Sequence, residues 1–274
     1  MRIDIVHSSL MGYKTVWEER EYLLKLALVP LIVKFMSTIL VYAMEIELLS
    51  LRHVLFMVPS YIVEGWMIGQ FLRTLLTGER WPMKIPKSPT KEQIGFMLWR
   101  ARGILGVILC FTLVMLIQGG AAVYMTDLKE LLEVEPRDTP TASSFPLLVA
   151  AFALMFFTIW IFRLVWIYIP LAVLMPMGTF LKEIKGIMTS VYMAGVWLLS
   201  IVPVMFVVML FSGLFFGGGD GSLSGISGFL TIMLHVFGEL LSQIVAITAM
   251  AYAFKAILIK YGATPIFNEP AKPF

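Results

Sequence analysis

The stretch VLFMVPSYIVEGWMIGQFLRTLL, residues 54–76, is long and apolar enough to cross a lipid bilayer as one helix. Glu64 lies near the midpoint of this stretch. A carboxylate is costly at that depth, and intramembrane carboxylates are usually paired with another polar group or used in function. The rest of the chain is therefore expected to supply a partner for Glu64.

The composition of the chain is typical of a membrane protein. Of its 274 residues, 59% are hydrophobic and 14% are charged, whereas soluble domains average about 45–50% apolar and about 25% charged residues. The net charge of +3 is too small to indicate a nucleic-acid partner. Cys110 is the single cysteine, so no intrachain disulfide can form. The charged first twenty residues are not those expected of a cleavable signal peptide.

Hydropathy predicts an all-α membrane bundle with about six transmembrane helices. The predicted spans are residues 22–44, 53–76, 95–119, 146–170, 191–215 and 229–257. Residues 1–21 mix apolar and charged side chains, which predicts an amphipathic cytoplasmic segment at the membrane surface or an ordinary polar helix start. Residues 22–257 then form the six-span domain, and residues 258–274 form a cytoplasmic tail.

Lysine and arginine are distributed unequally between the two sides of the predicted bundle. Because positively charged loops favour the cytoplasm, both termini are predicted to be cytoplasmic. The densest basic set comprises Arg73, Arg80, Lys84, Lys87, Lys91, Arg100 and Arg102. This set is predicted either to bind the headgroups of anionic lipids or only to fix the topology.

Five ionisable residues lie inside the predicted spans, in addition to those nearer the cytoplasmic ends: Lys34, Glu64, Arg163, His235 and Glu239. Lys34 and Glu64 lie near the midpoints of consecutive antiparallel spans. We therefore predict an ion pair or a shared proton between them. The alternative is a neutral Glu64, because burial in a medium of low dielectric disfavours the charged carboxylate.

The other three intramembrane residues have alternative predicted roles. His235 and Glu239 are four residues apart, hence on one helix face, and can hydrogen bond or belong to a proton path. Arg163 lies nearer the cytoplasmic end of the fourth span and can reach Glu239 or extend to the headgroups. The whole set is consistent with structural pairing inside the bundle or with an ion or substrate pathway.

A weak internal repeat relates the two carboxylates. Residues 26–36 and 199–209 share apolar positions and a proline at a constant offset, and the span after each contains one mid-depth carboxylate. Small residues spaced by four accompany both Glu64 and Glu239, and such spacing lets helices approach closely. Chance similarity between membrane segments explains the repeat equally well.

Signatures of enzymes and cofactor sites are absent from the sequence. It has no HExxH, no GxSxG, no cluster of Cys and His and no nucleotide-binding loop. His7, His53 and His235 are far apart and at different predicted depths, so no metal site is expected. We expect no enzymatic activity and no cofactor. The expected partners are the bilayer, with anionic lipids as candidates, and a membrane-protein partner or a second copy of the chain.

The segment RLVWIYIP, residues 163–170, is followed by an amphipathic connector to Ser190 and by Trp197 near the start of a span. This layout resembles bacterial six-span inner-membrane families, the nearest being the membrane domain attached to some glycerophosphodiester phosphodiesterases. TVWEEREYLLKLALVP, residues 15–30, also resembles the beginning of their first span. The sequence contains no phosphodiesterase domain. The resemblance therefore implies a bacterial inner-membrane location and a six-helix bundle, without catalytic activity.

Two functions fit these features. The first is a non-enzymatic inner-membrane protein that acts as a scaffold or complex subunit in envelope or lipid homeostasis. The alternative is a small transporter or channel that uses Lys34, Glu64, Arg163 and Glu239 as a charged intramembrane pathway.

Overall fold

The computed structural model describes residues 4–48, 50–82, 90–133, 158–216 and 225–260. Within these residues the chain forms ten α-helices and one 3-10 helix. Four helical segments are long and apolar enough to cross a membrane: Arg20–Ala43, Lys91–Tyr124, Ile187–Gly213 and Gly228–Ala253. In its described residues the chain is thus all-α with four candidate membrane spans, and these correspond to the first, third, fifth and sixth predicted spans.

The predicted second span is divided into two helices that meet at Met57. These are α3 (Leu51–Phe56) and α4 (Val58–Thr77), and Pro59 lies in the first turn of α4, where a missing N–H is tolerated. α4 contains the polar residues Glu64, Gln70 and Arg73, and most of its side chains are buried. A helix surrounded by protein does not need an apolar outer surface, which explains its low hydropathy.

The predicted fourth span, residues 146–170, is described only from residue 158. Thr158–Leu171 is an apolar helical segment shorter than the four candidate spans. It includes the 3-10 helix η1 (Phe162–Trp166) and α7 (Tyr168–Leu171). The helix ends there, and α8 (Met177–Glu183) begins after Pro176, which makes no side-chain capping bond. Six spans are therefore not seen in the described residues.

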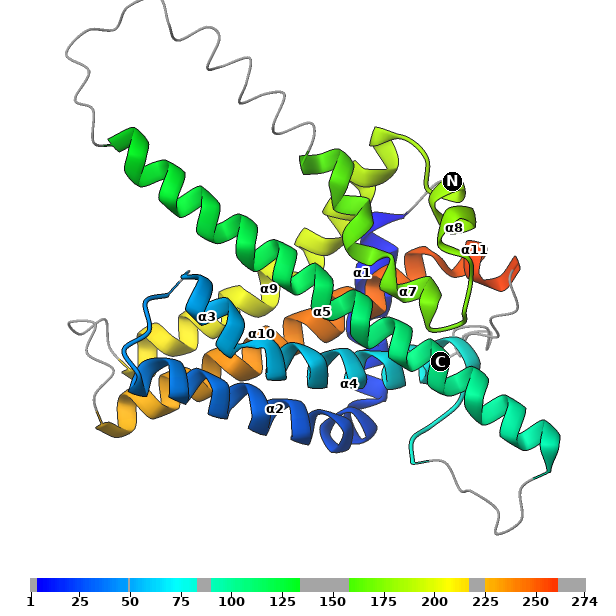
Figure 1. Cartoon of the computed structure of the whole chain (residues 1–274), viewed down its shortest axis with the longest axis horizontal. Coiled ribbons are helices and arrows are strands. Elements are labelled where there is room, and N and C mark those ends of the chain that lie inside the picture. The colour runs from blue at the N-terminus through cyan, green and yellow to red at the C-terminus, as the bar shows by residue number, and fades with distance from the viewer. Residues whose placement is uncertain (1–3, 49, 83–89, 134–157, 217–224, 261–274) are drawn as a thin grey trace, which may run out of the picture.

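The long helices pack around α4. Its neighbours are α2 (Arg20–Ala43), α5 (Lys91–Glu133) and α10 (Gly225–Ala253). α9 (Ile187–Phe216) packs on α10 and on η1, and the short α11 (Lys255–Lys260) follows α10. α2, α4, α9 and α10 run side by side, with α5 lying across the group (Figure 1). The core is largely the buried apolar side of α4 and the facing sides of these helices.

α1 (Ile5–Glu18) runs at a steep angle to the long helices and packs on α9 and α10 (Figure 1). Its small residues Ser8, Gly12 and Thr15 are buried. A Cβ atom on Gly12 would lie 2.8 Å from the Cβ of Ala249, so glycine permits the close approach of the two helices. The amphipathic segment is thus helical and docked on the bundle through its small residues; its place at the membrane surface stays a prediction.

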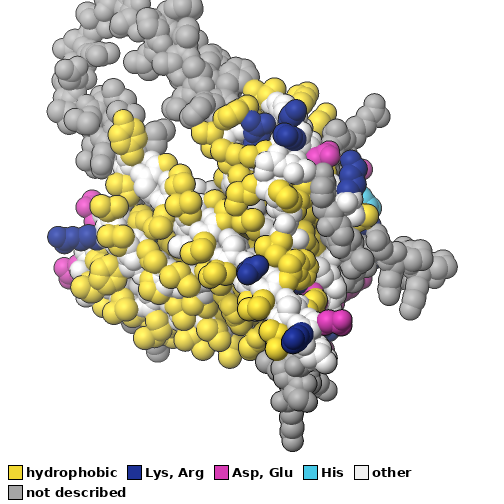
Figure 2. All heavy atoms as spheres, turned by 45° about the vertical axis from the view of Figure 1, so that its right-hand side comes forward, with side chains coloured by type: hydrophobic (Ala, Val, Ile, Leu, Met, Phe, Trp, Pro, Cys, Tyr) yellow, Lys and Arg dark blue, Asp and Glu magenta, His cyan; other side chains and the backbone are white. Residues whose placement is uncertain are grey.

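The outer surface is predominantly apolar. Figure 2 shows hydrophobic side chains over much of one face, with charged side chains mainly toward its edges. In α9, for example, the side chains of Leu198, Val202, Phe206 and Met209 are exposed. Apolar surface on this scale is typical of contact with lipid, so the described helices are consistent with a position in a bilayer.

Candidate functional site

Three helices converge on the ammonium group of Lys34 in α2. Its Nζ lies 3.0 Å from Oε1 of Glu64 in α4 and 2.9 Å from Oε1 of Glu239 in α10. The predicted contact between Lys34 and Glu64 is therefore present. The structure adds Glu239 as a second carboxylate on the same lysine, so the two carboxylates related by the weak repeat share one partner. We call these three residues the charge triad.

The two carboxylates of the charge triad differ in exposure. The side chains of Lys34 and Glu64 are 1% and 0% exposed, whereas that of Glu239 is 50% exposed. Ser60 donates a 2.6 Å hydrogen bond to Oε1 of Glu64, and Oε2 of Glu64 has no hydrogen-bond partner in the described part of the chain. With all three groups ionised, one positive and two negative charges leave a net charge of −1. A proton or a second cation would neutralise it.

Glycines beside the two carboxylates let α4 and α10 pack closely on two further helices. A Cβ atom on Gly65 would lie 3.0 Å from Cα of Ile108 in α5, and one on Gly238 would overlap the side chain of Val208 in α9. Small residues at such positions allow helices to pack backbone to backbone. Each carboxylate thus follows or precedes a glycine that fixes its helix against a neighbour.

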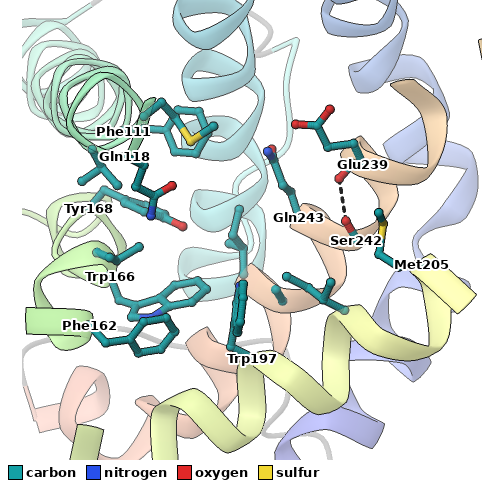
Figure 3. A pocket seen from close by; sticks show the side chains of 16 residues that line it. Phe111, Gln118, Phe162, Trp166, Tyr168, Trp197, Met205, Glu239, Ser242 and Gln243 are labelled. Atoms are coloured by element: carbon teal, nitrogen blue, oxygen red, sulfur yellow. Dashed lines mark hydrogen bonds between the residues drawn. The ribbon is translucent and has the colours of Figure 1, made fainter. Parts of the chain in front are cut away.

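A cavity of about 320 Å³ lies beside Glu239. Its described walls come from α5, the segment from η1 to α7, α9 and α10. Figure 3 shows Glu239 and Gln243 on the α10 side, across from a group of aromatic side chains. The aromatic lining residues are Phe111, Phe162, Trp166, Tyr168 and Trp197.

Two buried polar atoms in the cavity wall lack hydrogen-bond partners among the described residues. They are Nε1 of Trp166, a side chain only 3% exposed, and Oε1 of Gln243. Leaving such a group unpaired costs about 1–3 kcal/mol. Ser242, by contrast, donates a 2.8 Å hydrogen bond to the backbone carbonyl of Glu239 (Figure 3). The cavity therefore offers the half-exposed carboxylate of Glu239 to a ligand, whereas these two atoms are covered by protein.

Arg163 and His235 do not join the charge triad. The guanidinium of Arg163 lies 4.3 Å from the ring centroid of Trp160, a cation–π geometry. The exposed His235 has its Nδ1 2.9 Å from the backbone oxygen of Thr231 on its own helix. Within the described residues, the salt-bridge partner of Glu239 is Lys34 rather than either of these two.

A second buried group of charges lies further along α4. Arg73 is fully buried and donates bonds of 2.9 and 2.7 Å to the carboxylate of Glu79 and one of 2.7 Å to the carbonyl of Ala172. Arg100 donates a 2.9 Å bond to Gln70, and its Nη1 lies 3.4 Å from Glu79. We call Arg73, Arg100, Glu79 and Gln70 the arginine cluster.

The arginine cluster includes two members of the basic set that was predicted to bind lipid headgroups. Arg73 and Arg100 are buried and bonded to protein groups, so they are not surface cations as the prediction supposed. Arg80 is exposed and donates a hydrogen bond to Glu19. Lys91 and Arg102 are also exposed, whereas Lys84 and Lys87 lie outside the described residues. For these five the headgroup site stays a prediction.

The cavity and its aromatic walls were missed by reasoning from the sequence, because the lining residues come from segments far apart in the chain. Two local signals were available: Ser60 lies one helical turn before Glu64, and Ser242 lies beside Glu239. Comparisons of the chain with protein-family models, with curated proteins and with solved structures gave no match.

Proposed function

We propose that this chain is a small multi-pass membrane transporter in which the charge triad couples ligand binding to charge movement. The observation that supports the proposal is the position of Lys34 between a fully buried carboxylate and a carboxylate half exposed beside a cavity. A purely structural pair needs only one carboxylate for one lysine. The second carboxylate places an excess negative charge next to space that a ligand can enter.

Competition for Glu239 is the proposed coupling step. When a proton or a cation from the cavity neutralises Glu239, Lys34 stays paired with Glu64, and the net charge of the triad with its ligand is zero. When the cation leaves, Lys34 again contacts both carboxylates. A charge at the centre of a bilayer costs at least about 2.5–3.5 kcal/mol, so the unliganded triad is expected to favour uptake of a cation.

We also propose a bacterial inner-membrane location with both termini in the cytoplasm. The uneven distribution of lysine and arginine between the predicted loops supports this orientation. The resemblance to the membrane domain of glycerophosphodiester phosphodiesterases supports the location. In the proposed six-span topology, α3 with α4 forms the second span, and the segment that ends at Leu171 forms the fourth.

A scaffold or complex subunit in envelope or lipid homeostasis is the second candidate function. The observation that favours it is the nearly complete burial of both Lys34 and Glu64. Buried ion pairs can serve to fix one arrangement of the helices. In this case anionic lipids, a membrane-protein partner or a second copy of the chain would occupy the outer surface, and the triad would bind no ligand.

Flux measurements in proteoliposomes separate the two functions. The purified protein would be reconstituted into liposomes that contain a pH-sensitive dye, and proton movement would be followed under a potassium diffusion potential. The measurement would then be repeated with a gradient of Na⁺, of K⁺ and of tetramethylammonium in turn. If the chain is a transporter, flux exceeds that of empty liposomes. Glu64→Gln and Glu239→Gln should each reduce it to background, because both keep the side-chain volume and remove the charge.

Glu18→Gln is the matched control, because this carboxylate is exposed on α1 and pairs only weakly with Lys14 at 3.8 Å. Its flux should equal that of the wild type. Wild-type flux no greater than that of empty liposomes for every cation, or flux that survives both triad substitutions, would overturn the transport proposal and leave the scaffold.

A further inference from the structure

The aromatic cavity beside Glu239 defines a class of ligand. We infer that the cavity binds a small organic cation that has an aromatic ring next to a quaternary or alkylated ammonium group. This inference rests on the proposed function, because it names the substrate class of the same site. The charge of the cavity and the aromatic nature of its walls support it.

The charge of the site selects a cation. Glu239 is the one charged side chain among the described lining residues, and it is half exposed. Lys34 is already shared with Glu64 at 3.0 Å, so it cannot fully neutralise both carboxylates. Arg163, which was predicted as a possible partner of Glu239, is stacked on Trp160 and is not among the lining residues. An anionic ligand would meet unbalanced negative charge here.

The walls of the cavity select an aromatic or quaternary cation over a small metal ion. Phe162 forms edge-to-face pairs with Trp166 and Trp197, with ring centroids 6.0 and 5.6 Å apart, and Phe111 pairs with Tyr168 at 5.5 Å. Aromatic faces attract cations that have weak hydration, and cages of such rings recognise quaternary ammonium groups. A hard metal ion would instead require several oxygen ligands.

The size of the cavity restricts the ligand further. A volume of about 320 Å³ is at the lower limit for cavities that bind drug-sized molecules, so the ligand is small. A quaternary ammonium group donates no N–H, so such a ligand is held by the charge of Glu239 and by contact with the aromatic walls rather than by hydrogen bonds.

The test uses benzyltrimethylammonium as the probe and the full-length protein in a neutral maltoside detergent. Binding is measured by isothermal titration calorimetry and by quenching of tryptophan fluorescence. We expect saturable binding of the probe, weaker binding of tetramethylammonium, which lacks the ring, and no binding of phenylacetate, which carries the opposite charge. Glu239→Gln should weaken binding about tenfold or more, and Trp197→Leu about three- to tenfold.

One control variant keeps the result interpretable. Trp17→Leu removes a tryptophan that is 70% exposed on α1, outside the cavity. It should bind the probe as the wild type does. The thermal stability of each variant is measured from the reactivity of Cys110 on heating, and probe binding is compared between variants of equal stability. If Glu239→Gln does not fold, Trp197→Leu still decides the question.

The outcomes separate this inference from the proposed function. Absence of probe binding, equal binding of phenylacetate, or affinity unchanged by both substitutions overturns the inference, even where carboxylate-dependent flux persists. Probe binding that depends on Glu239 supports it, even where no flux is found, and then only transport is overturned. Displacement of the probe in phosphatidylcholine nanodiscs but not in phosphatidylglycerol nanodiscs would show that a headgroup without an aromatic ring occupies the cavity and would overturn the requirement for a ring; binding in both supports a free aromatic cation.

Discussion

The charge triad and the arginine cluster both contain buried charges and residues of α4, and they differ in how completely those charges are bonded. In the arginine cluster, Arg73 uses three nitrogens in hydrogen bonds and also stacks over the ring of Trp99 at 4.3 Å. In the charge triad, Oε2 of Glu64 lacks a partner among the described residues, and Glu239 is half exposed. The first is bonded almost completely, and the second is left open on one side.

The difference indicates which group is structural and which is available for a ligand. A buried charge is tolerated when hydrogen bonds and counter-charges replace the lost hydration. The arginine cluster meets this condition with groups of the protein, including the carbonyl of Ala172. The charge triad meets it only in part, and the part left open faces a cavity.

Glu79→Gln should have the largest effect on stability. It removes the carboxylate that bonds both Arg73 and Arg100, and breaking a buried pair in this way costs about 3–5 kcal/mol. We expect a large fall in the midpoint of thermal unfolding in detergent, followed with a thiol-reactive dye at the single Cys110. Glu18→Gln, on the exposed face of α1, should leave the midpoint unchanged. A wild-type midpoint for Glu79→Gln would show that the cluster is not structural.

Lys34→Met should have a smaller effect, about 2–3 kcal/mol, because Glu239 can turn to solvent or take up a cation when its partner is lost. Glu64, which is fully buried, then remains without a counter-charge. Adding Glu64→Gln to Lys34→Met should recover part of the stability, as a double-mutant cycle would measure from denaturant unfolding. Additive effects of the two substitutions would exclude a direct interaction between them.

Gly103→Ala should destabilise the protein by about 1–3 kcal/mol through the arginine cluster. A Cβ atom at this position would lie 2.9 Å from the carbonyl of Ala172 and 3.2 Å from Nη1 of Arg73, two groups that bond each other. Gly106→Ala is the control, because its Cβ would lie 3.8 Å from Leu171, an ordinary contact. Tryptophan fluorescence on heating reports both. Equal midpoints for the two variants would contradict the packing argument.

Ser60→Ala should have the smallest effect, about 1 kcal/mol, because it removes one hydrogen bond to Glu64 and leaves Lys34 in place. We expect a clearer effect on flux than on stability, because Glu64 without this hydrogen bond would compete with Glu239 for Lys34 with a different strength. Ser60→Thr, which keeps the hydroxyl, should restore wild-type flux. Loss of flux in the threonine variant as well would assign the effect to packing.

Much of the helical architecture follows from the sequence, because the length and hydropathy of a span are local properties. The contact of Lys34 with Glu64 could also be predicted, since consecutive antiparallel spans place residues of equal depth side by side. The approach of Glu239 could not, because hydropathy does not say which distant helix packs beside α2. The burial of Arg73 was hidden for a similar reason: its bonds to Glu79 and Ala172 depend on a loop and on a distant segment.

The polar composition of α4 has a consequence for how the chain enters a membrane. In the proposed topology this helix is the second span, yet it contains Glu64, Gln70 and Arg73 and buries most of its surface in the protein. Such a segment partitions poorly into lipid on its own. We therefore expect it to wait beside α2 at the insertion machinery until α5 has been synthesised. A reporter fused after residue 80 should then show incomplete insertion, and one fused after residue 133 complete insertion; equal insertion of both would rule out this order of assembly.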